Sequence, residues 1–315
     1  MFLLEPAYKD YIWGGTLLAR RFGKGRGMPI VAESWELSTH RDGLTLLPDG
    51  TSLRDYLAGH SGAGGRTVGR DGQLPILVKL IDAQRPLSVQ VHPDDRYAGR
   101  TAGERGKTEL WHVLDAQPGA FLYLGVNRPV AREELERRIG DNTVEEILRK
   151  VPVHPGESYF VPAGMLHAIG GGCLICEVQQ SSNLTYRVYD YGRKGADGKP
   201  RPLHIQDALA VARLTPTDTT PPGQTGPERY GGLERRTVVQ CPYFTMRELN
   251  LHASASYGAE RDDFCHLLCV EGEVLAEKGG ETLSLPAGAG LFLSAGEDVE
   301  LQGDGRLLAV SGGVI

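Results

Sequence analysis

The sequence of 315 residues lacks the features of a membrane or secreted protein. No stretch approaches the roughly 18 consecutive apolar residues that a membrane-spanning helix needs. The first residues, Met1-Phe-Leu-Leu-Glu-Pro6, lack the basic start and the long apolar stretch of a secretory signal peptide. We therefore expect a cytoplasmic protein that does not bind a membrane.

Cysteine is also scarce. Five cysteines leave at least one thiol unpaired, and the cytosol keeps thiols reduced, so we expect no disulfide framework. Cys173 and Cys176 form a C-x-x-C, a spacing that redox and zinc sites use. No second C-x-x-C accompanies this pair, and it lies in an apolar, strand-like run, so we interpret both residues as buried structural thiols.

Positive charge is not in excess either. The chain has 34 Lys and Arg against 40 Asp and Glu, a net charge of −6, and nothing global points to nucleic acid. Exposed charges are screened beyond about 8 Å at physiological salt, so local cations decide whether an anionic substrate binds. We expect a small-molecule partner. No obvious interface stripe is present, which favours a monomer or a weak homodimer.

Short alternating runs typical of strands dominate the chain, and two smaller cores are more natural than one for this length. Helical spacing is clearest over about 130–150, interrupted by Gly140-Asp-Asn142, and again over 204–214. Residues 215–229 contain four prolines and are typical of a linker. We therefore predict a first domain over 1–230, with the helical segments inside it, and a second over 231–315.

The stretch from Pro86 to His167 concentrates side chains that bind metals. Gln90 and His92 lie two residues apart in an alternating run, so both point to one face of a strand. Glu109 lies in a second strand-like run, and His167 follows a third. One amide, one carboxylate and two imidazoles are a suitable ligand set for zinc or another divalent metal. The alternative is that the two histidines are hydrogen-bonded core residues.

His167 ends a segment that fits the second cupin motif, G-x5-P-x-G-x2-H, from Gly156 through Pro162 and Gly164. Proline and glycine there form a tight turn that directs the histidine into the barrel. A weak echo of this spacing has valine in place of histidine, and consists of Gly288, Ser294, Gly296 and Val299. We therefore predict a mainly β fold of two cupin-like, jelly-roll β-barrels with a small helical portion, the second barrel being degenerate and without a metal site.

The full set of motifs resembles the type I phosphomannose isomerase family, also called mannose-6-phosphate isomerases, in its short bacterial form. The resemblance runs from Trp13 to about Arg193 through Trp13-Gly-Gly15, Ala32-Glu-Ser-Trp-Glu-Leu37, Leu77-Val-Lys-Leu80, Gln90-Val-His92, Lys107-Thr-Glu109, Gln180-Ser-Ser-Asn183 and Arg187. It implies a zinc-dependent isomerase that interconverts D-mannose 6-phosphate and D-fructose 6-phosphate through a cis-enediolate. One Zn²⁺ per chain would be held by Gln90, His92, Glu109 and His167.

The resemblance also implies roles for charged residues. Glu177 matches the glutamate that precedes the pocket arginine of the family, and we predict that it is the general base, although lysine and histidine are also assigned that role. Arg187 matches an essential arginine, and its guanidinium suits a phosphate or a developing enediolate. Lys107 matches a lysine implicated in ring opening or proton handling. Lys79 and Ser88 match positions that line the sugar-phosphate end.

The residues alone leave other interpretations open. Without the resemblance, a surface or cross-strand ion pair is the better interpretation of Glu177. Lys79 is equally consistent with a side chain that points into a polar cavity and with one that extends from its strand to the surface. The other polar residues fit salt bridges or turn hydrogen bonds. At the level of function, the alternatives are another metal-dependent cupin enzyme, such as an iron dioxygenase or a different sugar isomerase, and a non-enzymatic sugar-binding cupin.

Overall fold

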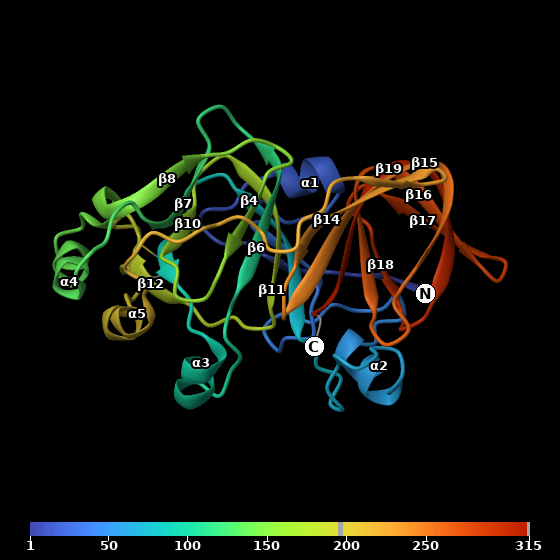
Figure 1. Cartoon of the computed structure of the whole chain (residues 1–315), viewed down its shortest axis with the longest axis horizontal. Coiled ribbons are helices and arrows are strands. Elements are labelled where there is room, and N and C mark those ends of the chain that lie inside the picture. The colour runs from blue at the N-terminus through green and yellow to red at the C-terminus, as the bar shows by residue number, and fades with distance from the viewer. Residues whose placement is uncertain (195–197, 314–315) are drawn as a thin grey trace.

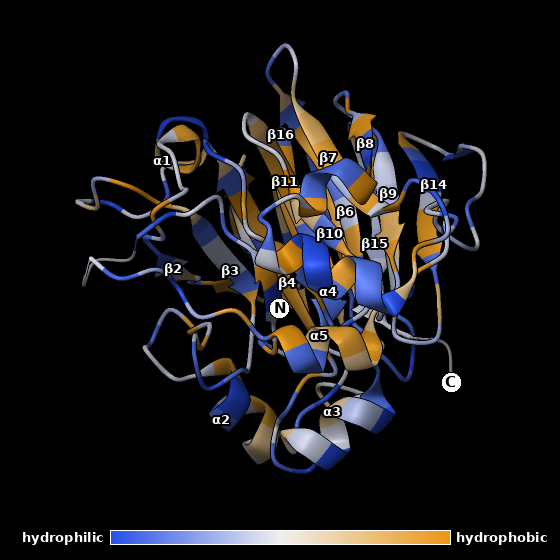
Figure 2. Ribbon diagram, turned by 90° about the vertical axis from the view of Figure 1, so that its left-hand side faces the viewer, coloured by the Kyte–Doolittle hydropathy of each residue, from blue (hydrophilic) through white to orange (hydrophobic). Residues whose placement is uncertain are grey.

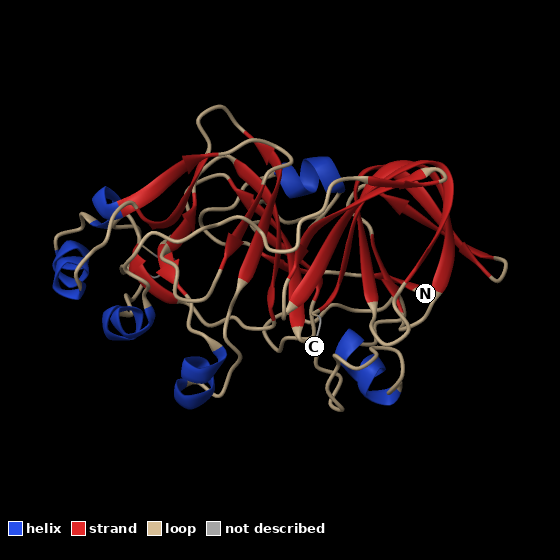
Figure 3. Ribbon diagram, in the orientation of Figure 1, coloured by secondary structure: helices blue, strands red, loops and turns tan. Residues whose placement is uncertain are grey.

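The computed structural model describes residues 1–194 and 198–313, and their regular structure is mainly strand (Figure 3). The strands form three sheets in two bodies that lie side by side, with the helices at the periphery (Figure 1). Among the described residues, no helix is long and apolar enough to cross a membrane. The predicted mainly β fold with a small helical portion is confirmed.

Two facing sheets build the first body. The six-stranded sheet has the order β2 (Ala7–Lys9), β3 (Glu33–Leu37), β4 (Ile76–Ala83), β11 (Cys173–Gln180), β6 (Glu109–Ala116) and β9 (Ser158–Val161). The five-stranded sheet has the order β12 (Tyr186–Tyr189), β5 (Val89–Val91), β10 (His167–Ile169), β7 (Phe121–Val126) and β8 (Leu148–Pro152).

The six-stranded sheet is covered on both faces, which explains why every residue of β4 and β11 is buried. Alternate side chains of a strand point to opposite faces. Accordingly, Ile81 packs with Leu122 in the core between the two sheets. Its neighbour Leu80 packs with Phe264 in a core shared with the second body. Strands buried on both sides are near-continuously apolar, so the polar residues that do occur in β4 and β11 stand out.

The same alternation separates the two cysteines of the C-x-x-C. Cys173 and Cys176 are three residues apart on β11, so they point to opposite faces and belong to different cores. All five cysteines are free and buried. The interpretation of the pair as buried structural thiols is therefore confirmed.

Short helices surround the sheets. They are α1 (Leu17–Phe22), α2 (Leu53–Gly59), α3 (Asp95–Thr101), α4 (Arg132–Gly140), the 3-10 helix η1 (Val144–Ile147) and α5 (Ile205–Val211). In Figure 2, α4 and α5 lie in front of the five-stranded sheet and carry both hydrophobic and hydrophilic residues. Leu135 and Ile139 of α4 are one helical turn apart and pack with Leu209 of α5 against Val89 and Leu166.

The helical stretch expected over 130–150 contains α4 and η1 and ends at Ile147. The interruption falls at Asn142, which has a positive φ of 58°. From Leu148 onward the chain is extended because β8 pairs with β7, with Leu148 opposite Val126.

The second body is one large sheet. Its order is β1 (Phe2–Leu4), β18 (Gly290–Leu293), β16 (Cys265–Lys278), β19 (Asp298–Gly312), β15 (Phe244–Gly258), β14 (Leu233–Gln240) and β13 (Glu228–Tyr230), and β17 (Glu281–Pro286) pairs with β16. The N-terminal strand β1 thus belongs to the C-terminal sheet, where it pairs with β18 at one edge. Among the described residues the strand order ends at two edges, so the fold is an open jelly roll rather than a closed barrel.

The predicted echo of the cupin motif is visible in the backbone. Gly156 and Gly288 have φ values of 86° and 95°, and Gly164 and Gly296 have 88° and 70°. Both segments therefore place their two glycines in the left-handed region that favours glycine. Val299, at the position equivalent to His167, is buried and apolar. The second body therefore repeats the turn with an apolar side chain in place of the histidine.

Candidate active site

A cavity of about 410 Å³ lies between the two sheets of the first body. Its wall includes residues from both sheets: Lys79, Glu177 and Trp111 from the six-stranded sheet, and Gln90 and Arg187 from the five-stranded sheet. Ser88 and Lys107 also line it. Every predicted catalytic and substrate-binding residue therefore borders a single cavity.

Sheet register sets the order of residues along one wall. Gln90 on β5 is directly opposite His167 on β10 and, on its other side, opposite Arg187 on β12. Directly opposed residues in neighbouring strands share a face of the sheet. Arg187, Gln90 and His167 thus form a row across three strands.

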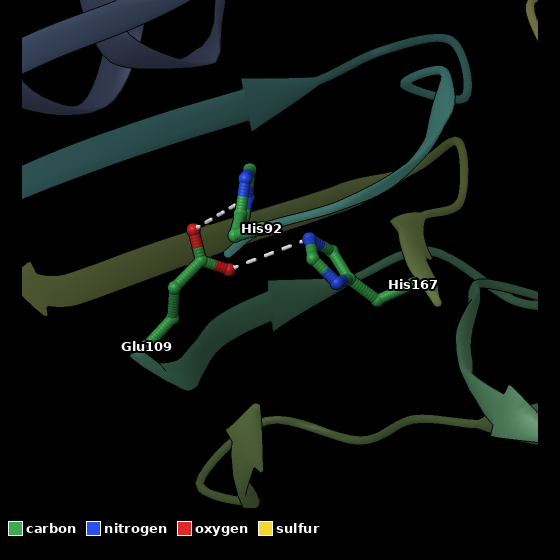
Figure 4. A group of neighbouring side chains, drawn as sticks. All are labelled: His92, Glu109 and His167. Carbon is green, nitrogen blue, oxygen red and sulfur yellow. Dashed lines mark ion pairs between the residues drawn. The ribbon is translucent and has the colours of Figure 1, made fainter. Parts of the chain in front are cut away.

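The three predicted metal-binding residues with charged or imidazole side chains come together next to this row. One donor atom from each of His92, Glu109 and His167 lies within 4.8 Å of the others (Figure 4). The Nε2 atom of His92 is 3.3 Å from Oε1 of Glu109, and Nε2 of His167 is 3.7 Å from Oε2. All three are almost fully buried, so they lie behind the cavity wall, whereas Gln90 is part of that wall.

Backbone carbonyls fix the orientation of both imidazoles. Nδ1 of His92 is 2.9 Å from the carbonyl oxygen of Leu184, and Nδ1 of His167 is 2.8 Å from that of Met165. A carbonyl oxygen only accepts hydrogen bonds, so each Nδ1 donates and each Nε2 keeps its lone pair. Histidines that bind metals are held in this way by their second ring nitrogen.

The ionisation states suit a metal. Burial, and then the nearby Lys107 ammonium, lower the pKa of His92 to about 3, and burial also lowers the pKa of His167. Burial alone would raise the pKa of Glu109, but the Lys107 ammonium outweighs it and holds that pKa well below its usual range. The group therefore presents two neutral imidazoles and one carboxylate.

A divalent cation fits these donors. Oε2 of Glu109 and Nε2 of His167 are buried and have no hydrogen-bond partner among the described residues. Leaving such atoms unsatisfied costs about 1–3 kcal/mol each, and a cation coordinated by both would remove that cost. Lys107 lies 2.5 Å from Oε1 of Glu109 and 3.2 Å from Nε2 of His92. A positive charge is thus already favoured beside these atoms.

A second group of charges lies on the six-stranded sheet. The Lys79 ammonium is 3.5 Å from Glu33 and 3.4 Å from Glu177, and it lies over the ring of Trp35. Its side chain is only 5% exposed, so the alternative in which Lys79 extends to the surface is wrong. Burial would lower the pKa of Lys79, but Glu33, Glu177 and Glu109 outweigh it and raise that pKa, so the amine stays charged.

Glu177 is held at one oxygen. Trp111 donates its indole N–H to Oε2 at 2.8 Å, while Oε1 faces Lys79. Cross-strand register explains the arrangement, because Glu177 is directly opposite both Lys79 and Trp111. Burial and the charge of Glu109 raise the pKa of Glu177 despite the two nearby lysines.

Sequence reasoning missed Glu33 as a member of this group. Glu33 accepts from the indole of Trp35 at 2.7 Å and contacts Lys79 from the other side, as Glu177 does with Trp111. The signal was present: Glu33 and Trp35 are two residues apart in an alternating run, so they share a face.

Arg187 and Ser88 form a third group. Nε of Arg187 donates to the Ser88 hydroxyl at 3.2 Å, and Nη1 donates to the carbonyl of Pro202 at 3.0 Å. Burial is the main cause that lowers the pKa of Arg187 below its ordinary value. The site thus combines a group of two histidines and a glutamate that could hold a metal ion, a lysine between two carboxylates, and an arginine at one end of the row.

Comparison with known proteins gives consistent matches over the chain. A family model for the type I phosphomannose isomerase catalytic domain matches residues 1–109, and one for the mannose-6-phosphate isomerase cupin domain matches 234–311. The chain is 37% identical over 302 residues to mannose-6-phosphate isomerase ManA of Bacillus subtilis, covering 91% of this chain and 93% of ManA.

Solved structures agree with these matches. The crystal structure of the Bacillus subtilis mannose 6-phosphate isomerase has a TM-score of 0.91 and 33% identity, with 98% of both chains covered. A mannose 6-phosphate isomerase bound with zinc and yttrium has a TM-score of 0.79 at 22% identity, with 100% of both chains covered, and shares the fold.

Proposed function

The chain belongs to the type I phosphomannose isomerase family, and we propose that it interconverts D-mannose 6-phosphate and D-fructose 6-phosphate through a cis-enediolate with one bound Zn²⁺. The observation that carries the proposal is the buried group of His92, Glu109 and His167 next to a cavity lined by Glu177 and Arg187. An aldose–ketose isomerase needs such a pair of features, because it must stabilise charge on two sugar oxygens and move a proton between two carbons.

In this proposal Gln90, His92, Glu109 and His167 hold the zinc. A bound Zn²⁺ is a Lewis acid that stabilises negative charge developing on neighbouring substrate oxygens. Glu109 is the only charged ligand, so about one positive charge remains at the centre. Gln90 offers a neutral oxygen from the cavity wall, on the side where the sugar enters. Lys107 lies against the ligands and is suited to handle the proton of ring opening.

Glu177 is the proposed base that moves a proton between C1 and C2. The pKa of Glu177 is raised towards neutral pH, and a general base works best when its pKa lies near the operating pH. The Trp111 hydrogen bond fixes Oε2, so the carboxylate has a defined orientation. Lys79 remains an ammonium beside Oε1, and it stabilises the carboxylate form that accepts the proton.

Arg187 and Ser88 are proposed to bind the phosphate. The row from His167 through Gln90 to Arg187 spans two strand spacings, about 10 Å between the backbones of β10 and β12. A sugar bound with C1 and C2 near the metal extends its C6 phosphate away from it. An arginine at the far end of the row is well placed for that group. Lys79 completes the cationic lining, although its nearest partners are the two carboxylates.

We also propose that the chain divides near residue 230, apart from β1, which pairs with β18 of the second sheet. The first domain, 1–230, would hold the zinc site, and the second, 231–315, would lack one. Cytoplasmic location and a monomeric or weakly dimeric state stay predictions of the sequence.

The test is conversion of mannose 6-phosphate by the purified, zinc-loaded chain, with fructose 6-phosphate measured as product. We expect turnover by the natural chain, and loss of both zinc and turnover in His92→Ala and His167→Ala. A folded, zinc-loaded chain that forms no fructose 6-phosphate contradicts the proposal and favours a sugar-binding role or another substrate. Oxygen-dependent activity with iron would instead favour a dioxygenase.

A further inference from the structure

A buried carboxylate with arginines around it borders the Arg187 end of the cavity. Asp190 follows β12 directly and its side chain is 6% exposed. Arg201 contacts it through two atoms: Nε is 2.7 Å from Oδ2 and Nη2 is 2.5 Å from Oδ1. This two-point contact fixes the guanidinium plane. Arg201 itself lines the cavity, together with Arg187 and Ser88.

Arg193 holds Asp190 from another side. Its Nε is 3.1 Å and its Nη2 is 2.5 Å from Oδ1, while Nη1 donates to the carbonyl of Pro86 at 2.5 Å. Arg193 does not line the cavity. It therefore fixes the carboxylate that in turn fixes Arg201.

The charges in this cluster do not balance. Among the residues that the structure describes, Arg193 and Arg201 contact the carboxylate of Asp190 and Arg187 lies at the same end of the cavity, so three guanidiniums share one carboxylate and two positive charges remain. The pKa of Arg187 is lowered first by burial and then by repulsion from Arg201, which outweighs the attraction of Asp190. A phosphate monoester carries about −1.5 to −2 charges at pH 7, so its charge matches the excess.

We propose that Arg201 is a second phosphate-binding guanidinium, which acts with Arg187 and Ser88 to select the phosphorylated sugar, and that Asp190 and Arg193 are positioning residues for it. This inference rests on the proposed function and adds a residue to its substrate site. Two planar guanidiniums meeting one phosphate give directional hydrogen bonds that a single arginine does not provide. The competing interpretation is an ion pair that only fastens the segment around Arg201 to β12.

Kinetics of Arg201→Gln separate the two interpretations. We expect the KM for mannose 6-phosphate to rise at least 10-fold with kcat within about 3-fold of the natural chain. Arg201→Lys keeps the positive charge without the planar guanidinium, so its KM should lie between that of the natural chain and that of Arg201→Gln. A purely structural ion pair predicts a lower melting temperature with an unchanged KM, and that result overturns the inference.

Two further measurements complete the test. The matched control is Arg54→Gln, because Arg54 forms an arginine–aspartate pair with Asp71 at 2.9 Å away from this cavity, and its KM should not change. Binding of inorganic phosphate, measured by calorimetry, should weaken at least 10-fold in Arg201→Gln, and equal binding overturns the inference. Calorimetry needs no turnover, so a chain that binds phosphate through Arg201 but forms no fructose 6-phosphate refutes the proposed function alone.

Discussion

Glu177→Gln is the sharpest probe of the proposed chemistry. Glutamine has nearly the shape of glutamate, and its side-chain oxygen still accepts the Trp111 indole N–H that now bonds Oε2 at 2.8 Å. The change removes the group that accepts a proton but leaves His92, Glu109 and His167 in place. A general base contributes about 10²–10⁴-fold, or about 3–5 kcal/mol of transition-state stabilisation. We therefore expect kcat/KM to fall by that factor with zinc content unchanged.

The assay follows fructose 6-phosphate formation, with bound zinc measured on the same samples. Glu33→Gln is the matched control, because Glu33 is also near Lys79, at 3.5 Å, and also accepts from an indole. It removes the same charge beside the same lysine, so a general electrostatic role predicts equal losses. A base role predicts a loss at least tenfold larger for Glu177→Gln. Equal losses, or turnover of Glu177→Gln within about 3-fold of the natural chain, refute the assignment.

Three other outcomes follow from the structure. Activity should decline in acid at a pH above the ordinary glutamate pKa of 4.5, because the base works ionised and the pKa of Glu177 is raised by burial; an acidic limb at or below 4.5 in the pH profile of kcat/KM contradicts this. Gly164→Ala should lower both the melting temperature and the bound zinc, because φ is +88° and the new Cβ would lie 2.9 Å from the Val211 carbonyl oxygen. The control is Gly156→Ala, which has a similar φ but open space around the new Cβ, so its unfolding free energy should fall only by the conformational cost of about 1–2 kcal/mol. His266→Leu should reduce the loss of stability in acid. Burial lowers the pKa of His266 to about 3, so below about pH 6.5 the unfolded chain binds a proton that the folded chain does not bind. Between pH 7 and 5, the unfolding free energy measured in urea should therefore fall by about 2 kcal/mol less in the variant than in the natural chain.

Local patterns in the sequence were sufficient to find the group of His92, Glu109 and His167. Gln90 and His92 share a face because strand side chains repeat every two residues, and the cupin spacing places His167 after a glycine turn. The structure brings His92, Glu109 and His167 together as that reasoning predicts. The ligand roles of all four residues stay predictions, and that of Gln90 is supported by its position opposite His167.

Local sequence patterns could not predict which residues of distant strands contact one another. The pairing of Lys79 with Glu177 depends on the register of β4 against β11, which are nearly a hundred residues apart in sequence. For that reason the sequence left the direction of Lys79 open. The local alternation indicated that Glu33 and Trp35 share a face, but it did not predict that Glu33 contacts Lys79, because that contact depends on the pairing of β3 with β4.

The helical range over 130–150 illustrates a different limit. The apolar spacing that indicates a helix continues to Leu148, but the chain there pairs with β7 as an edge strand. A short apolar run fits either structure, and tertiary pairing decides between them. The buried thiols of Cys173 and Cys176, in contrast, were predictable because the pair lies in an apolar, strand-like run with no second C-x-x-C.

The most direct test of the account is a zinc titration of the metal-stripped chain, followed by the rate of fructose 6-phosphate formation from mannose 6-phosphate. The account predicts no turnover without metal, a linear rise as zinc is added, and a break at one zinc per chain. Full turnover by the stripped chain in the presence of a chelator would contradict it, as would a zinc-saturated, folded chain that leaves mannose 6-phosphate unchanged.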